Sequence, residues 1–333
     1  MIKTPYLLFL GDAPDQLAAK VAQGIKDWRP ENAVGQLRME GCKADLGLTD
    51  MTLEQAKQAG AKTLVIGVAN RGGVISAAWK TVLLSALAAG FDIASGLHNL
   101  LRDETDLVAA AADHGGHLVD VRVPTEDYPI ANGVPRAGKR MLAVGTDCSV
   151  GKMYTALAVD TEMRARGLKS SFRATGQTGI LITGGGVPLD AVIADFMAGS
   201  IEHLTPDNDP DHWDIIEGQG SLFHVSYSGV TLALIHGGQP DALVVCHEPT
   251  REHMRGLPGY RLPSIAAVRD LALSLAKVAN PACQVVGISV NTQHLSEANA
   301  KAYLITVEAE LGLPTVDPFR HGAERLVDAL VAV

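Results

Sequence analysis

Residues 142–153 read LAVGTDCSVGKM, and this stretch decides the fold of the second half of the chain. An apolar run leads into a glycine-rich loop, the loop ends in Lys152, and a helical pattern follows at once. Gly145 permits a sharp turn, Gly151 lets backbone N–H groups close around phosphate oxygens, and the helix adds the positive end of its dipole. Strand, loop, Gly-Lys and helix together predict a phosphate-binding P-loop.

The last position of this loop departs from the usual P-loop. A Ser or Thr normally follows the lysine and holds the Mg²⁺ of a bound nucleotide, whereas Met153 follows Lys152 here. A thioether binds Mg²⁺ poorly, so we expect no Mg²⁺ and a pyrophosphate that is not hydrolysed, such as that of coenzyme A. Thr155 remains an alternative source of a hydroxyl. The predicted cofactor-binding residues are Gly145, Thr146, Asp147, Cys148, Ser149, Val150, Gly151, Lys152 and Met153.

Short apolar runs alternate with helical patterns along both halves of the chain. In the first half we expect strands at 6–11, 63–69, 91–96 and 117–122, and helices at 53–60, 77–90 and 105–116. In the second half we expect strands at 140–145, 170–176, 212–220, 242–249 and 283–292, and helices at 153–168, 189–204, 228–238, 265–279 and 295–312. This alternation predicts an α/β protein with parallel sheets and crossover helices.

A polar, proline-containing stretch, VPTEDYPIANGVPRAGKR at 123–140, separates the two halves. Such a stretch is typical of a connection between domains. We therefore predict an N-terminal domain at 1–135 and a C-terminal domain at 136–333, each with its own parallel sheet.

Composition excludes several classes of function. The 333 residues are 47% hydrophobic and carry a formal net charge of −9, so no overall basic field attracts nucleic acid or an anionic membrane. No apolar run reaches transmembrane length. The four cysteines are scattered without zinc-ligand spacing, which favours reduced thiols in a cytoplasmic protein and no metal site.

Polar side chains gather around two further glycine-rich turns. Arg173, Thr175, Gln177 and Thr178 follow a predicted strand end, where parallel sheets bind ligands, although a solvated connector would look the same. In GVANRGG, Asn70 and Arg71 open a second candidate anion-binding turn, in a domain that either completes a cleft or serves as a docking module. The predicted substrate-binding residues are Asn70, Arg71, Arg173, Thr175, Gln177, Thr178 and Arg251.

Acid and base candidates lie near two other strand ends. Glu217 lies at the end of a predicted buried strand. It could be a metal-binding acid, a general base or a structural acceptor for backbone N–H groups. His224 and Tyr227 follow in the next loop, and His247 ends another strand. These four residues form the predicted catalytic set. Arg251 or Arg255 could bind a carboxylate bidentately, although arginines in a solvated loop would look the same.

Two motifs resemble those of dethiobiotin synthetase-like P-loop proteins. GTDCSVGK resembles their GTD-x-x-VGK loop, and IIEGQGS resembles their E-G-x-G strand end. In that family the hydroxyl after the lysine and the acidic residue of the strand help to hold Mg²⁺. Glu217 matches the acidic residue, but Met153 replaces the hydroxyl. An Mg·ATP-dependent ligase or kinase is thus a second hypothesis, and a non-catalytic nucleotide-sensing protein is a third.

A denser resemblance runs along essentially the whole chain. It rests on GVANRGG, GLHNLL, GTDCSVGKM, ATGQTGILI, VIADFMAGSIE, EGQGSL, YSGVTLALIHGGQPDALVVCHEPTR, GISVNT and GLPTVDPFRHGAERL. These motifs resemble the family of DgcN-type D-glutamate N-acetyltransferases, long called a domain of unknown function. The resemblance implies a Rossmann-like N-terminal domain and a P-loop NTPase-like C-terminal domain.

The same resemblance implies an activity. A member of that family transfers acetyl from acetyl-CoA to the amine of D-glutamate, in the catabolism of that amino acid. The P-loop would then hold the pyrophosphate of CoA, arginines would bind the two substrate carboxylates, and Glu217 or His224 would act as the base, between which the sequence does not choose. We also expect a homo-oligomer.

Overall fold

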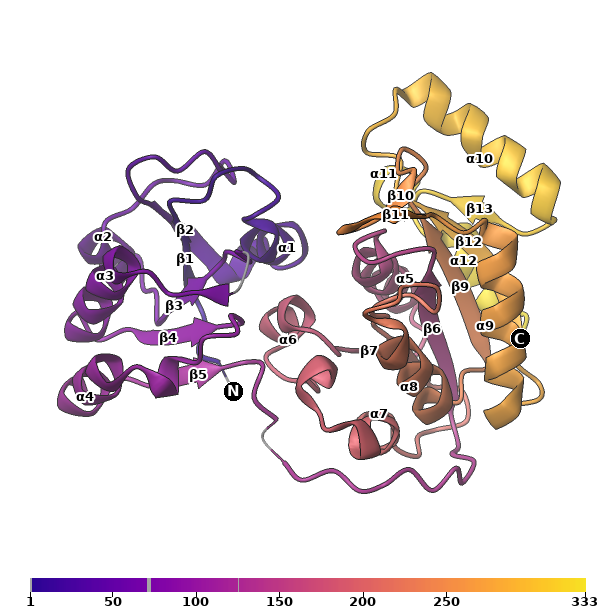
Figure 1. Ribbon diagram of the computed structural model, residues 1–333, viewed down its shortest axis with the longest axis horizontal. Helices are drawn as coiled ribbons and strands as arrows, with labels where there is room; N and C mark the ends of the chain where they lie inside the picture. Colours follow the sequence, from indigo (N-terminus) through magenta and orange to yellow (C-terminus); the bar gives the residue numbers. More distant parts are fainter. Residues whose placement is uncertain (1, 71–72, 125) are drawn as a thin grey trace. The chain divides into compact units, whose positions relative to one another are not determined.

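The computed structural model describes residues 2–70, 73–124 and 126–333. Within them the chain forms two compact units, each around its own parallel sheet (Figure 1). The first unit contains the chain up to residue 124 together with Gly176–Ala191, and the second contains Glu126–Thr175 and Val192–Val333. The predicted α/β class with two parallel-sheet domains is confirmed.

The first unit has a five-stranded sheet in the order β2-β1-β3-β4-β5. Its strands are β1 (Tyr6–Gly11), β2 (Ala33–Arg38), β3 (Thr63–Ile66), β4 (Asp92–Ser95) and β5 (Leu118–Asp120). Its helices are α1 (Lys20–Trp28), α2 (Leu53–Gln58), α3 (Ala77–Ala88), α4 (Thr105–His114) and α6 (Gln177–Thr183), with short 3₁₀ turns η1 (Pro30–Asn32), η3 (Leu101–Asp103) and η4 (Leu189–Ala191). Helices α3 and α4 pack together, and α1 packs against α6.

The second unit has a six-stranded parallel sheet in the order β13-β12-β9-β6-β8-β7. Its strands are β6 (Lys139–Gly145), β7 (Ser170–Arg173), β8 (Trp213–Ile216), β9 (Ala242–His247), β12 (Gln284–Val290) and β13 (Thr315–Val316), and an antiparallel hairpin adds β10 (His253–Met254) and β11 (Leu257–Arg261). Its helices are α5 (Lys152–Ala165), α7 (Met197–Leu204), α8 (Ser228–Gly238), α9 (Ile265–Ala279), α10 (Glu297–Leu311), α11 (Pro318–His321) and α12 (Glu324–Val331), with a 3₁₀ turn η5 (Ala194–Phe196).

Strand order places the helices of the second unit in two layers. Right-handed crossovers put α5 on one face of the sheet and α7, α8 and α9 on the other, because the chain reverses its direction across the sheet after β7. Helix α5 packs with α11 and α12, and α8 packs with α7 and α9 (Figure 1). The central strands β6 and β9 are buried nearly throughout. None of the helices in the described part of the chain has the length and apolar character that a membrane crossing needs.

The structure corrects one predicted helix and adds elements that the sequence did not predict. The helix predicted at 189–204 is wrong in its first half, where η4 and η5 precede α7. The chain passes from the first unit to the second after Ala191, and Asp190 is held in the first unit by an ion pair with Arg122. Residues 177–183, for which the sequence predicts neither a helix nor a strand, form α6. Strand β2 and helix α1 were also not predicted, since glycines interrupt both patterns.

The structure also divides the chain differently from the predicted boundary at 135/136. The segment 126–135 belongs to the second unit. The backbone N–H groups of Asn132 and Gly133 each donate to the buried carboxylate of Glu202 on α7, over 2.9 Å. The carbonyl of Pro129 lies so close to Gly199 on α7 that a Cβ there would be 1.8 Å from it. This segment is therefore an anchored part of the second unit.

We expect Gly199→Ala to lower the free energy of unfolding by about 1–3 kcal/mol, because the added methyl group overlaps the Pro129 carbonyl and forces the segment away from α7. The measurement is urea unfolding followed by circular dichroism. Gly229 on α8 is the matched control, because a Cβ there meets nothing within 4 Å. Gly229→Ala should be neutral or stabilising by up to about 1 kcal/mol. Equal destabilisation by both variants would contradict the contact.

Candidate functional site

The P-loop connects β6 to α5 at the carboxyl edge of the second sheet. The strand order reverses beside β6, which is where open α/β sheets bind ligands. A Cβ on Gly145 would lie 2.8 Å from Val150 Cγ2 and 3.1 Å from the Cys246 carbonyl oxygen, so only glycine fits that turn. Gly151 has a φ of +102° and precedes Lys152, the first residue of α5. The loop predicted from the sequence therefore has the backbone that a P-loop requires.

Lys152 lies inside this loop. It is 5% exposed, and its Nζ donates to the Asp147 carbonyl oxygen over 2.8 Å. Burial lowers the pKa of its ammonium. The side chain passes Gly218, where a Cβ would lie 3.0 Å from Lys152 Cδ and 1.6 Å from the Ala143 carbonyl oxygen. Gly218 is therefore required first by the close approach of the Ala143 carbonyl oxygen and also leaves space for the stem of the P-loop lysine.

Asp147 is a fully buried carboxylate within the loop. One oxygen, Oδ1, accepts from the Cys148 N–H over 2.7 Å, and Oδ2 accepts from Arg251 Nη1 over 2.7 Å and from the Arg255 N–H over 2.8 Å. Arg251 Nη1 also donates to the Cys148 carbonyl oxygen over 2.7 Å. Arg251, predicted to bind a substrate carboxylate, is therefore placed against the P-loop, and its charge faces Asp147.

The hydroxyl of Thr155 is turned into the core. Its Oγ1 donates to the Gly151 carbonyl oxygen over 3.0 Å and lies 2.7 Å from Ser289 Oγ. Thr155 is 1% exposed. The alternative in which Thr155 replaces the missing metal-binding hydroxyl is therefore not supported by its position, and Met153 stands alone at the usual hydroxyl position.

His224 connects two loops through both ring nitrogens. Its Nδ1 accepts from the Ser226 N–H over 3.2 Å, and its Nε2 lies 3.1 Å from the Arg255 carbonyl oxygen. A carbonyl only accepts, so the ring proton is on Nε2. The ring is 1% exposed and packs on Tyr227 with centroids 4.7 Å apart. Backbone groups therefore engage both ring nitrogens of this buried imidazole, and neither nitrogen is free to accept a proton from a substrate.

His247 ends β9 beneath the P-loop. Its Nδ1 lies 3.0 Å from Thr146 Oγ1, and its ring stacks on Tyr303 with centroids 6.1 Å apart. Burial lowers the pKa of His247 to about 4, so the ring is neutral at pH 7. A base with that pKa is weak, and the geometry gives His247 the task of orienting Thr146 within the loop.

Glu217 follows β8 at the same sheet edge and is 5% exposed. Its Oε2 accepts from the Thr175 N–H over 2.8 Å, while Thr175 Oγ1 donates to the Glu217 carbonyl oxygen over 2.8 Å. Gln219 Nε2 donates to Thr175 Oγ1 over 3.2 Å. The structure thus brings together two predicted residues, Glu217 and Thr175. Arg173 Nε instead donates to buried Asp214 over 2.7 Å.

Three further predicted substrate residues, Asn70, Gln177 and Thr178, lie in the first unit. Gln177 and Thr178 open α6, and a Cβ on Gly96 would lie 2.8 Å from Gln177 Cβ. Asn70 Nδ2 donates to the Val74 carbonyl oxygen over 2.8 Å. Arg71 lies outside the described residues. The sequence-predicted substrate set is therefore divided between the two units: Gln177 and Thr178 belong to the first, and Arg173 and Thr175 belong to the second.

Three possible metal ligands, from Asp147, Cys148 and His224, lie within 4.8 Å of one another in the described part of the chain. Their chemistry does not favour a cation. Both Asp147 oxygens and both His224 nitrogens already have partners, and burial raises the pKa of the Cys148 thiol. Lys152 and Arg251 contact Asp147 directly. The surroundings are those of an anion site.

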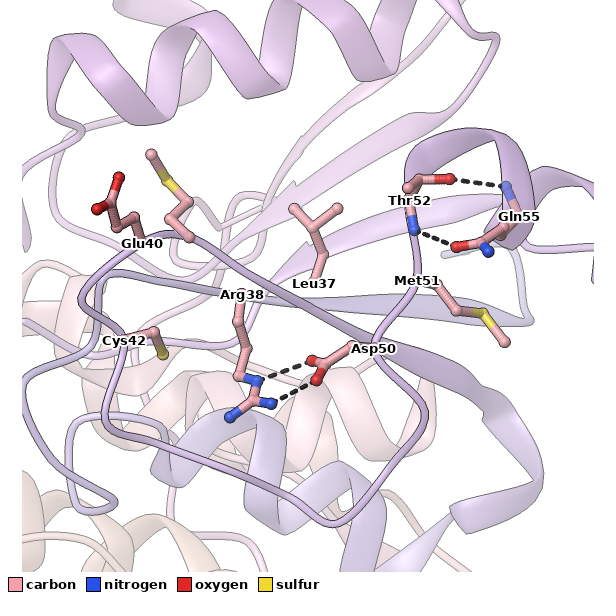
Figure 2. A pocket seen from close by; sticks show the side chains of 9 residues that line it. Leu37, Arg38, Glu40, Cys42, Asp50, Met51, Thr52 and Gln55 are labelled. Carbon is pink, nitrogen blue, oxygen red and sulfur yellow. Dashed lines mark hydrogen bonds and ion pairs between the residues drawn. The ribbon is translucent and has the colours of Figure 1, made fainter.

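A cavity of about 520 Å³ lies in the first unit, beside the end of β2 (Figure 2). Arg38 is a cation in its lining, but its guanidinium binds both oxygens of Asp50 and lies 3.2 Å from Asp45. Glu40 adds another negative charge to the lining. Since its arginine is neutralised, this cavity is poorly suited to a dicarboxylate or a phosphate ester.

Arg255 is the alternative to Arg251 as a carboxylate-binding residue, and it is not in the predicted substrate-binding set. Its Nη1 hydrogen-bonds Ser149 Oγ in the P-loop. In the sequence it is indistinguishable from a solvated loop arginine, because the contact joins residues 106 positions apart.

Family models, relatives of known name and a solved structure all match this chain over most of its length. The model of the P-loop domain of family DUF1611, a domain of unknown function, matches residues 129–327, and the model of its Rossmann-like N-terminal domain matches 37–124. A D-glutamate N-acetyltransferase of Tritonibacter scottomollicae is 75% identical over 100% of both chains, and one of a Pseudoalteromonas species is 48% identical over 98% of both. The crystal structure of a DUF1611 family protein of Anabaena variabilis superposes with a TM-score of 0.90 at 33% identity, covering 99% of this chain and 100% of that one.

We expect His247 to make stability depend on pH. Its pKa falls from an ordinary 6.5 to about 4 on folding, so the unfolded chain binds the proton more readily between these values. The contribution of the neutral His247 ring to the free energy of unfolding is complete above pH 6.5. It is lost as pH falls toward 4, which lowers that free energy by about 3 kcal/mol at most. His247→Gln should flatten the slope of unfolding free energy between pH 6.5 and 4, measured by urea unfolding. Exposed His294→Gln is the control, and an unchanged slope in His247→Gln would contradict the assignment.

Proposed function

The chain belongs to the DUF1611 family, and from its relatives and its site we infer that it is a D-glutamate N-acetyltransferase. Identity of 75% over the full length of a relative with that name carries the inference. The protein is an acyltransferase with a small-molecule substrate. The function expected from the sequence motifs is thus confirmed.

Acetyl-CoA is the acyl donor in this proposal. A P-loop with a buried lysine and a helix N-terminus suits the pyrophosphate of CoA, which stays intact while the thioester reacts. Met153 and the core-facing hydroxyl of Thr155 support a site that binds this pyrophosphate without a metal-bound hydroxyl. These are also the observations against Mg·ATP-dependent ligase or kinase chemistry.

We assign the general base to Glu217. The amine of D-glutamate must lose a proton before its lone pair can attack the thioester carbonyl carbon. His224 has both ring nitrogens engaged, and His247 has a pKa of about 4. Of the predicted acid-base residues, Glu217 is the carboxylate at the sheet edge beside the P-loop lysine, next to Gly218. Tyr227 is about half exposed and packs on the His224 ring, and we assign it no role in the reaction.

The reaction then balances in two steps. The neutral amine forms a C–N bond to the acetyl carbon, and the carbonyl electrons move to oxygen, where N–H donors of the site stabilise the charge. The attacking nitrogen, positively charged after the C–N bond forms, loses its second proton as the oxyanion collapses and the C–S bond breaks. The leaving CoA thiolate takes up one proton, and the proton that Glu217 took from the ammonium is released to solvent. The products are an N-acetyl amino acid and free CoA.

We propose that the protein lies in the cytoplasm and assembles as a homo-oligomer. The scattered cysteines support the first. Exposed apolar side chains on α9 and α10, Val278 at 73% and Ile305 at 61%, support the second. The net charge of −9 supports a protein without a nucleic-acid partner.

The deciding experiment mixes purified protein with acetyl-CoA and D-glutamate and follows free thiol. We expect thiol release that depends on D-glutamate and is unchanged by EDTA or by omission of ATP. Turnover that requires Mg·ATP would overturn the acetyl-CoA proposal and favour the ligase or kinase. Binding of CoA and ATP without turnover of any amino acid would favour a sensor.

Glu217→Gln should lower kcat by about 10²–10⁴-fold, because the amide accepts no proton. His224→Gln should have a much smaller effect on kcat, since that ring connects loops. Steady-state kinetics with saturating acetyl-CoA measure both, and melting temperatures verify folding. A larger kcat loss in His224→Gln than in Glu217→Gln would reverse the assignment of the base.

Lys152→Ala should raise the Kd for CoA by about 10–100-fold, since a charged hydrogen bond to phosphate contributes about 1.5–3 kcal/mol. Met153→Leu should change it less than about threefold, because no metal ligand is removed and the volume is conserved. Isothermal titration with CoA makes the comparison. Equal and severe losses in the two variants would contradict a metal-independent phosphate site.

A further inference from the structure

We propose that Arg255 binds a phosphate group of the acyl donor and that Asp147 positions it. The inference rests on the proposed function, in which the donor is a phosphate-bearing thioester held on the P-loop. It adds to the P-loop one further residue that binds the acyl donor, located in the turn between β10 and β11. The P-loop and this hairpin belong to the same unit, so their contacts are fixed within one compact body.

The first observation is an available positive charge beside the loop. Arg255 is exposed, and its Nη1 hydrogen-bonds the hydroxyl of Ser149. Arg251 uses its guanidinium on Asp147, whereas the ion pairs found between described residues include none from Arg255. A guanidinium at a P-loop with no carboxylate partner suits a phosphate, because its planar fork binds two phosphate oxygens at once.

The second observation is that buried side chains hold the backbone of Arg255. Its N–H donates to Asp147 Oδ2 over 2.8 Å, and its carbonyl oxygen accepts from His224 Nε2 over 3.1 Å. Asp147 is 0% exposed and His224 is 1% exposed. Gly256 follows with a φ of +77°, which turns the chain into β11. An exposed arginine with both backbone groups anchored is pre-organised, which lowers the entropy lost on binding.

The third observation concerns the P-loop itself. Ser149 has a φ of +55°, a left-handed conformation that is uncommon for serine, and its carbonyl oxygen accepts from Arg251 Nη2 over 3.1 Å. The Asp147 carboxylate binds that same arginine and the Arg255 N–H. One buried carboxylate therefore fixes both the loop and the hairpin arginine. Asp147 acts through Arg255 and is a positioning residue.

The test is steady-state kinetics of Arg255→Gln with acetyl-CoA and D-glutamate varied separately. We expect the KM for acetyl-CoA to rise about 10–100-fold, with kcat within about threefold and the KM for D-glutamate unchanged. Arg255→Lys should recover part of the loss, since it restores charge without the fork. Arg261→Gln is the matched control, because Arg261 is an exposed arginine at the far end of the same hairpin. It should leave all constants unchanged.

Asp147→Asn tests the positioning role. It should raise the KM for acetyl-CoA, and its effect should be non-additive with Arg255→Gln, because Asp147 acts partly through that arginine. Inhibition by inorganic pyrophosphate gives an independent readout, which should weaken about 10-fold or more in Arg255→Gln. Melting temperatures exclude misfolding as the cause.

The outcomes separate this proposal from the proposed function. If the wild-type protein releases no CoA from acetyl-CoA with D-glutamate, the proposed function fails. If the wild type is active and Arg255→Gln leaves the KM for acetyl-CoA and the inhibition by pyrophosphate unchanged, the assignment of Arg255 alone is overturned. A rise confined to the KM for D-glutamate would also overturn it, by placing Arg255 on an acceptor carboxylate. Strict additivity with Asp147→Asn would remove the positioning role.

Discussion

The buried carboxylate of Asp147 is the constraint on which the site depends. A negative charge with no exposure is tolerated only where charged and hydrogen-bonding partners surround it. The two carboxylate oxygens accept from the P-loop backbone, from the Arg251 guanidinium and from the Arg255 backbone. The backbone carbonyl oxygen of Asp147 accepts from Lys152. Removal of this carboxylate would release the loop backbone, Arg251 and the hairpin together.

This arrangement separates binding from chemistry. Positive charge is gathered at the P-loop, where it suits a phosphate that stays intact during the reaction. Glu217, the proposed base, lies at the end of the neighbouring strand β8 and is bound to Thr175. Gly218, the next residue, lies between Glu217 and the P-loop: a Cβ there would overlap the Ala143 carbonyl oxygen and lie 3.0 Å from Lys152 Cδ. A fold shared with nucleotide-hydrolysing proteins thereby suits acetyl transfer, as the names of its relatives indicate.

The sequence pattern did not predict the structure of residues 177–196. The run LDAVIADFMAGSIEHL has helical periodicity, but the chain crosses between the units after Ala191, and only α7 forms as a regular helix. Segment 176–191 packs in the first unit because α6 meets α1 there. Periodicity describes which side of a segment is apolar, and it does not say which of two cores that side will join.

The sequence by itself determined the two parallel sheets, the P-loop and its missing metal hydroxyl, because these depend on local patterns of glycine, apolar and charged residues within about ten positions. Its motifs also indicated the family. Only the tertiary structure decided which candidate residues share a site. It turned Thr155 into the core, occupied both nitrogens of His224, bound Arg173 to Asp214 and brought Arg255 to the loop. Each of these outcomes depends on contacts between strands and loops that are distant in the sequence, and on the need to satisfy every buried polar group.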